Sequence, residues 1–473
     1  MDRFDALVIG HGLPELFAAL DLAEVGLRVA VLPGAEDLPE AAERDPDGAI
    51  AGAMQRLATP LPHAPEPRAG STQGGTAGGD LGTGSDSVAP REESGLALAR
   101  APYRPPLLRD RAGQWAPQAD PAVFGIPAMP LSVSAMRLLG TGSALRAYLD
   151  RLTPLLTIGK TRSFGRLIRN RIGPAALERL CEPLLRERYG VAAADIDTAL
   201  AAPGLNEALS RTGSLTSAAL AYSERYVARE TGVQSAAGWP AAQRAALRRL
   251  MNFDASVFDT GAASLEAAAD GSWVATLGED GARIEARALV VGLPRAVGPE
   301  QPAGEPVLPG EAMAIAAAAS RGGTRVYVDI AIQETAGIDP GEDAVDALGE
   351  WSLRIRRQDS GVSRLRALSR ARAGAEEARE SASKSAEELL ALLAGTDIQP
   401  VPGARPVVGR LAAPFATIAA REDAAASLER WQQEHPTLLV LGRALHGDDL
   451  AAAVAAGHHG AVELRRRLLG LSE

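Results

Sequence analysis

The pattern of hydrophobic and polar positions changes period twice near the start of the chain. A continuous apolar run at Ala6–Ile9 is typical of a buried strand, and Val29–Leu32 is a second such run. Between them, apolar residues recur at helical spacing, at Leu16, Ala19, Leu20 and Ala23. Gly26 follows, where a glycine commonly ends a helix. The order strand, helix, strand predicts a parallel βαβ unit within an α/β sheet that is covered on both faces.

Later segments show both kinds of period. Residues 132–230 have amphipathic helical spacing, and residues 371–394 predict a charged surface helix. Short apolar or alternating runs predict strands, the first two of them as a hairpin, at Ser272–Leu277, Arg283–Ala286, Ala288–Leu293, Thr324–Ile332 and Leu438–Gly442. Leu450–Leu469 predicts a last helix. The chain therefore ends, as it begins, with a strand followed by a helix.

This symmetry suggests one nucleotide-binding-type sheet assembled from both ends of the chain. We expect residues 1–62, 236–300 and 405–473 to form that discontinuous domain. Residues 101–131 and 301–404 are expected to form a second, α+β domain, and residues 132–235 a helical region. The Gly-, Ser- and Pro-rich stretch 64–95 lacks the apolar surface that would offset its ordering entropy, so we expect a flexible insert. A chain of 473 residues is long enough for two or three packed regions.

Composition excludes several classes of function. The formal net charge of −10 argues against a nucleic-acid partner, because such a protein needs a basic face. Cys181 is the single cysteine, which excludes an internal disulfide and a Cys-rich metal site; it is predicted to fill the core. The adjacent His458 and His459 point in different directions on a helix, so we expect no metal site.

Targeting signals are not recognisable in the sequence. The start Met1–Asp5 lacks the basic residues of a signal peptide, and no run of about 18 apolar residues occurs. We therefore expect a cytoplasmic protein, with peripheral membrane contact left open. The sequence makes no prediction of the oligomeric state.

The turn after the first strand contains part of a dinucleotide-binding motif. Gly10 and Gly12 match the first two glycines of G-x-G-x-x-G, in the expected place between a strand and a helix. Glu15 stands where the third glycine belongs, and its carboxylate would repel a diphosphate at the helix N-terminus. The acidic residue expected at the end of the second strand, which would bind ribose hydroxyls, is replaced by Pro33. A βαβ unit that binds no nucleotide is the alternative.

Two other motifs lead to no site. Gly159–Thr161 matches the last three residues of the phosphate-binding loop motif, but Pro154 stands where the first glycine of that motif should be. Gly140–Ala144 lacks the closing glycine of a nucleophile elbow. The arginines of the predicted helix after residue 161 are either a solvated face or partners for substrate carboxylates; they are Arg162, Arg166, Arg169 and Arg171.

Several segments together resemble a known family. Phe164–Gly173 is an arginine-rich helix with a glycine, and Glu182–Leu185 reads EPLL before Tyr189. This order is similar to that of the protoporphyrinogen and coproporphyrinogen oxidases, within the FAD-dependent amine oxidase superfamily. Phe124–Pro127 and Arg211–Leu215 resemble shorter segments of the same enzymes. The resemblance covers nearly the whole chain apart from the insert.

The resemblance implies a fold and a cofactor. It implies an α/β fold with a discontinuous Rossmann-like FAD/NAD(P)-binding domain, an inserted α+β substrate domain and a helical region. It also implies a C-terminal flavin motif, so the candidate cofactor-binding residues are Gly10, Gly12, Glu15, Gly442, Gly447, Asp449 and Leu450. Two departures weaken FAD binding: residues 34–56 lack the family's glycine-arginine segment, and Asp448 and Asp449 stand where the last helix should face the flavin. We therefore expect FAD to be held weakly or lost on purification.

Two functions follow from this reading. The first is an FAD-dependent oxidoreductase with a porphyrinogen-like small-molecule substrate, in which hydride passes to the flavin and the protein supplies binding and orientation. The sequence nominates no catalytic residue for it. The second is a degenerate, non-catalytic relative that binds a tetrapyrrole or a protein partner with little or no FAD. An amine oxidase or a desaturase is disfavoured by the match in the helical region.

Overall fold

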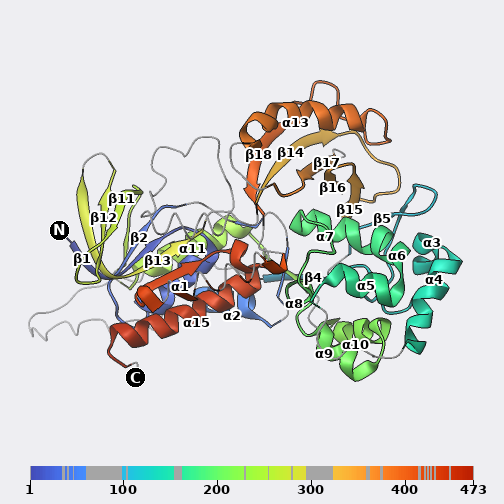
Figure 1. Ribbon diagram of the computed structural model, residues 1–473. Coiled ribbons are helices and arrows are strands. Elements are labelled where there is room, and N and C mark those ends of the chain that lie inside the picture. Colours follow the sequence, from blue (N-terminus) through green and yellow to red (C-terminus); the bar gives the residue numbers. More distant parts are fainter. Residues whose placement is uncertain are drawn as a thin grey trace, which may run out of the picture.

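A computed structural model shows two lobes (Figure 1). It describes residues 2–34, 38–39, 42–45, 47–59, 98–102, 105–153, 162–227, 231–253, 255–278, 281–293, 323–357, 363–372, 377–413, 417–419, 422, 426, 429–430, 433–446 and 449–471. The expected insert 64–95 lies outside the described residues. Within the described part of the chain, no helix is both long and apolar enough to cross a membrane.

The lobe that carries the N-terminus is built on a seven-stranded sheet. Its spatial order is β10-β2-β1-β13-β12-β11, with β19 also paired to β13. The strands are β1 (Asp2–Ile9), β2 (Val29–Leu32), β10 (Ser256–Val257), β11 (Ala262–Ala267), β12 (Trp273–Leu277), β13 (Ala282–Gly292) and β19 (Leu438–Leu441). Strands β10, β2, β1, β13 and β19 run parallel, and β11 and β12 add an antiparallel hairpin. The N- and C-terminal strands thus share one sheet, as the sequence predicts.

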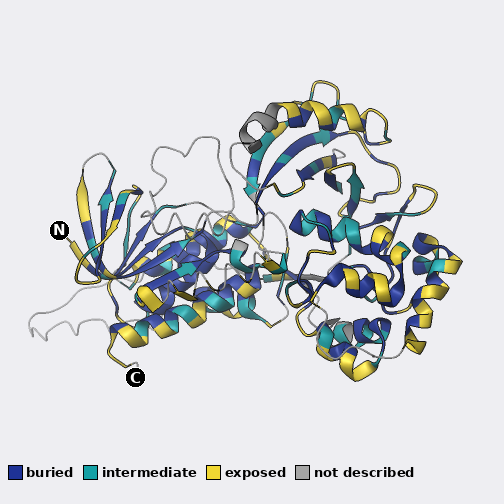
Figure 2. Cartoon of the chain, in the orientation of Figure 1, coloured by how far each residue is buried: buried dark blue, intermediate teal, exposed yellow. Residues whose placement is uncertain are grey.

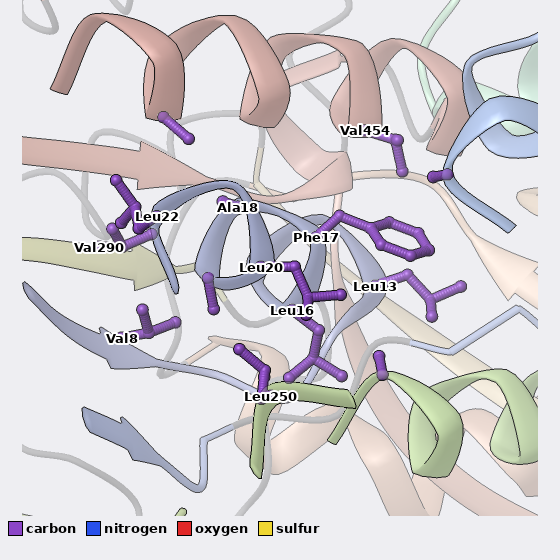
Figure 3. Close-up of a cluster of buried hydrophobic side chains, with 14 of the residues drawn as sticks. Val8, Leu13, Leu16, Phe17, Ala18, Leu20, Leu22, Leu250, Val290 and Val454 are labelled. Atoms are coloured by element: carbon purple, nitrogen blue, oxygen red, sulfur yellow. The ribbon is translucent and has the colours of Figure 1, made fainter. Parts of the chain in front are cut away.

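Helices cover this sheet and enclose α1 (Leu13–Ala23). Every residue of α1 is buried, because the helix lies between the sheet and the helices α11 (Trp239–Met251) and α15 (Leu450–Leu468). Figure 3 shows Leu16 and Phe17 of α1 among side chains from all three neighbours, such as Val8, Leu250 and Val454. A fourth helix, α2 (Ala49–Ala58), packs on α11 and α15. In Figure 2, α15 keeps an exposed outer face, which fits its amphipathic sequence.

The second lobe contains a five-stranded antiparallel sheet. Its order is β15-β16-β17-β14-β18, and the helix α13 (Glu377–Leu393) lies across one face. The strands are β14 (Thr324–Ile332), β15 (Asp343–Leu348), β16 (Trp351–Arg357), β17 (Ser363–Ser369) and β18 (Val407–Ala412). Alternate residues such as Val328 and Ile330 face α13 in a common core. β18 pairs with β14, so it belongs to this sheet and not to the first domain, where the expected boundary at 405 would put it.

The helical region lies beside the second sheet (Figure 1). Its helices are α3 (Val133–Leu139), α4 (Thr141–Tyr148), the 3-10 helix η2 (Leu149–Leu152), α5 (Phe164–Ile172), α6 (Pro174–Ala176), the π-helical turn η3 (Leu177–Cys181), α7 (Glu182–Tyr189), α8 (Thr198–Ala201), α9 (Leu205–Thr212) and α10 (Leu215–Val227). Cys181 is fully buried in their shared core, which confirms its predicted packing role.

Short strands join the lobes. β3 (Glu43–Arg44) and β4 (Leu98–Pro102) both pair with β9 (Thr231–Ser235), which follows the helical region in the sequence. Two small hairpins complete the fold: β5 (Leu108–Arg109) with β6 (Trp115–Ala116), and β7 (Ala122–Val123) with β8 (Ile126–Pro127). β3 and β4 thereby bring segments of the first lobe next to the end of the helical region.

Candidate functional site

The glycine turn has the local shape that the sequence predicts. β1 ends at Ile9, and Gly10 takes a φ of +133°, which a side chain would disfavour. The Gly10 N–H donates to the Leu32 carbonyl at 3.1 Å, which holds the turn against the end of β2. Gly12 is the N-cap of α1, with extended backbone angles. The turn thus sits at the carboxyl edge of parallel strands, where α/β sheets bind ligands.

Glu15 occupies the space that this turn normally leaves open. Its side chain is only 4% exposed and folds back toward the turn and the end of β13. A Cβ built on Gly12 would collide with Oε2 of Glu15, and a Cβ on Gly292 would lie 2.6 Å from Oε1. In dinucleotide-binding turns, the second glycine lets the diphosphate approach the backbone. Here the Glu15 carboxylate takes that place.

The described residues that end β2 and follow it, up to residue 34, offer no acceptor for a ribose. Leu32 is the last residue of the strand, and Pro33 and Gly34 follow it. A Cβ on Gly34 would lie 2.9 Å from the Cα of Gly10, so the backbone after β2 passes directly beside the turn. Neither residue has a side chain that can accept a hydrogen bond.

The C-terminal motif is present only in part among the described residues. Gly442 follows β19 with a φ of +136°, and Leu450 is fully buried as the first residue of α15. Asp449 is the N-cap of α15, and its side chain accepts a hydrogen bond from the N–H of Ala452 at 3.0 Å. Its carboxylate is therefore engaged at the helix N-terminus. Gly447 and Asp448 lie outside the described residues.

A cluster of charged and aromatic side chains lies where the two lobes meet. The guanidinium of Arg44 on β3 is 6.0 Å from the ring centre of Phe124, and that of Arg188 on α7 is 5.8 Å from the same ring. Arg188 also lies 5.7 Å from the ring of Tyr189. Phe124 has a φ of +44°, a backbone strain that is uncommon outside glycine and concentrates at functional sites. We call Arg44, Phe124, Arg188 and Tyr189 the junction cluster.

The C-terminal motif borders the junction cluster. Burial raises the pKa of Tyr189; the charge of Arg188 opposes this rise and that of Asp449 adds to it. Burial also lowers the pKa of His446, against the opposing charge of Asp449. His446 ends the 3-10 helix η5 (Arg443–His446), whose Arg443 is paired with Glu43 of β3 at 3.0 Å. Residues from β3, α7 and the start of α15 therefore meet at one place.

The arginines that the sequence offered as substrate partners lie elsewhere. Arg171 is buried and pairs at 2.6 Å with the fully buried Asp150, so it supports the helical region. Arg162 pairs with Glu422 at the surface, and Arg166 and Arg169 are exposed on α5. The sequence reading did not single out Arg44 or Arg188. Arg188 stands next to Tyr189, in a segment that resembles the family. Arg44 had no such signal, because the strand β3 that carries it is only two residues long and leaves no pattern in the sequence.

The histidines near the C-terminus make separate contacts. His458 Nδ1 lies 2.9 Å from Oδ2 of Asp21, and His459 Nδ1 lies 2.8 Å from the Ala455 carbonyl oxygen on its own helix. Among the described residues, no three His, Cys, Asp or Glu side chains are grouped to hold a metal.

Comparison with known proteins places the fold. No protein-family model and no curated protein matches this chain. Among solved structures, the chain is similar to a candidate protoporphyrinogen oxidase from Exiguobacterium sp. 255-15, at 15% identity, a TM-score of 0.63, and coverage of 98% of this chain and 99% of that one. It is also similar to reduced UDP-galactopyranose mutase, at 13% identity, a TM-score of 0.58, and coverage of 100% and 95%. An oxidoreductase from Methanosarcina mazei matches at 11% identity, a TM-score of 0.53, and coverage of 97% and 100%.

At such identities the likeness shows the fold alone. The chain therefore has the Rossmann-like FAD-binding fold that the sequence predicts. The residues at the diphosphate position do not fit the cofactor, because the Glu15 carboxylate fills the space over Gly12 and would face the diphosphate charge. Fold and local chemistry thus disagree at this one place.

Proposed function

We propose that this protein keeps the fold of FAD-dependent oxidoreductases, does not hold FAD tightly, and binds a planar, carboxylate-bearing molecule of the tetrapyrrole class at the junction cluster. The observation that carries the proposal is the position of the Glu15 carboxylate against Gly12. Helix N-termini favour anions, and here the chain supplies its own. A cofactor diphosphate would have to displace a buried side chain and tolerate its charge.

The junction cluster supports the choice of ligand. Arg44 and Arg188 place two guanidiniums near one aromatic ring, and a guanidinium binds a carboxylate in a bidentate manner. The half-buried Phe124 supplies a flat apolar surface on which a planar macrocycle can stack, and the fully buried ring of Tyr189 packs against it at 6.3 Å. In this function the protein binds and orients its ligand, and no redox step is assigned to its residues.

The visible spectrum of the purified protein tests the cofactor part. We expect wild-type protein to be colourless after dialysis, even when it is expressed with excess riboflavin. The double variant Glu15→Gly with Pro33→Glu opens the space over Gly12 and restores a ribose acceptor. We expect its FAD affinity, measured by calorimetry, to rise at least about tenfold, since a charged hydrogen bond contributes roughly 1.5–3 kcal/mol.

Pro33→Glu alone is the matched control, because it adds the acceptor while Glu15 stays in place. We expect it to leave FAD affinity unchanged. A yellow wild-type preparation with stoichiometric FAD that survives dialysis would refute the proposal.

The second candidate is an FAD-dependent oxidoreductase with a porphyrinogen-like substrate. The retained Gly10, Gly12 and Gly442, and a fold likeness over the whole chain, favour it. Its test is the fluorescence of porphyrin formed from coproporphyrinogen with added FAD. Turnover that depends on FAD would replace the binding function with this one.

A further inference from the structure

The second lobe contains a cavity that is separate from the glycine turn and the junction cluster. It has a volume of about 520 Å³ and lies between α13 and one end of the five-stranded sheet. Val326 of β14 and Trp351 of β16 line the sheet side, and Ala391 and Leu392 line the helix side. This volume falls within the range of about 300–1,000 Å³ that is typical of small-molecule sites. The mostly apolar wall favours a carbon-rich ligand.

One hydroxyl on the cavity wall makes no side-chain hydrogen bond to the described residues. Thr324 lines the cavity and is only 6% exposed, and within the described part of the chain its side chain makes no hydrogen bond. The hydroxyl of Ser369, which also lines the cavity, is engaged: it accepts from the Val326 N–H and donates to the Arg370 carbonyl. The Thr324 oxygen is not among the buried polar atoms without a partner, so it reaches the cavity space, where a hydroxyl can donate to or accept from a polar group of a ligand.

A cation stands next to that hydroxyl. Arg372 lines the cavity, and two backbone hydrogen bonds of 2.8 and 3.0 Å fix it beside Thr324. No ion pair holds its side chain among the described residues. Behind the wall, the buried Arg186 donates to the Gly349 carbonyl at 2.8 Å. Its pKa is lowered by burial and then by the nearby charge of Arg370, while the charges of Glu182 and Glu350 oppose this shift.

Two carboxylates, those of Glu350 and Glu388, also line the cavity, and neither is paired with Arg372 among the described residues. Glu350 pairs with Arg370 at 3.1 Å, so its charge is already balanced. Glu388 is exposed on α13. We propose that this cavity binds an apolar monocarboxylate, with its carbon chain or ring against Trp351 and Leu392 and its carboxylate between Arg372 and the Thr324 hydroxyl.

The test measures octanoate binding to the full-length protein by calorimetry and by quenching of Trp351 fluorescence, with Trp351→Phe to identify the signal. We expect octanoate to bind more tightly than octylamine. Ala391→Phe fills the cavity from an exposed helix position and should abolish binding. Arg372→Gln should weaken octanoate binding about tenfold. Glu388→Gln is the matched control, and it should leave the affinity unchanged or raise it.

Indole-3-acetate in place of octanoate distinguishes an aromatic from an aliphatic acid, and binding of either supports the site. Thermal melting of each variant establishes that it is folded. Unchanged octanoate affinity in folded Ala391→Phe would overturn the site, as would the absence of binding of both acids at millimolar concentration. Tighter binding of octylamine than of octanoate would overturn the assigned charge. None of these outcomes depends on whether FAD binds at the glycine turn.

Discussion

The carboxylate of Glu15 lies against Gly12, the residue that begins the helix on which Glu15 itself stands. The weak FAD binding that we propose has two explanations, the shape of this side chain and its charge. Glu15 is at the third position of α1, where a carboxylate favours the positive end of the helix. The group that we propose excludes the diphosphate is therefore also expected to stabilise the helix.

Glu15→Gln keeps the shape and removes the charge. We expect this variant to lose about 1 kcal/mol of unfolding free energy in urea, because its helix N-terminus no longer faces an anion. We expect FAD affinity to stay as low as in the wild type, because the amide still fills the space over Gly12. Glu178→Gln, at an exposed position, is the control for stability. Tight FAD binding by Glu15→Gln would mean that charge alone excludes the cofactor.

Arg44→Gln and Arg188→Gln test the junction cluster. Each removes one guanidinium from the ring of Phe124, so we expect each to weaken the binding of coproporphyrin about tenfold, as measured by absorbance titration. Arg166→Gln, on the exposed face of α5, should leave the affinity unchanged. Equal losses in all three variants would indicate a general effect of charge and contradict the assignment.

Asp150→Ala tests the buried ion pair of the helical region. The Asp150 carboxylate is fully buried, pairs with Arg171 at 2.6 Å and accepts from the Leu215 N–H at the start of α10. Its loss leaves a buried guanidinium without its counterion, so we expect the unfolding free energy to fall by about 3–5 kcal/mol. Glu422→Ala breaks an exposed pair with Arg162 and should cost about 0–1 kcal/mol. Similar losses for the two variants in guanidinium titrations would refute this distinction.

His446 predicts a pH dependence of stability. Burial lowers its pKa from the ordinary value of 6.5, so below that pH the unfolded chain binds a proton that the folded protein does not. Stability therefore falls as the pH drops below about 6.5 and rises again toward neutral pH. We expect His446→Gln to flatten this part of the melting temperature profile between pH 5 and 7. His459→Gln, at an exposed position, should leave the profile as it is in the wild type.

The sequence by itself determined the elements whose signals are local. The apolar runs at β1 and β2, the helical spacing of α1 and the glycine turn depend on residues close together in the chain, so their pattern predicts them. The burial of Cys181 follows from the same helical period. The sequence also predicted that Glu15 takes the place of the third motif glycine, because the spacing from Gly10 and Gly12 determines that position.

Only the tertiary structure decided which strands pair and which side chains meet. β13 lies between β1 and β19, and β18 pairs with β14 across the lobe boundary that we expected at residue 405. Strand pairing over such separations depends on the packing of whole layers, which no local period encodes. For the same reason, Arg44 and Arg188 appear in the sequence as two unrelated arginines. They become neighbours of Phe124 only when β3, the Phe124 turn and α7 pack together.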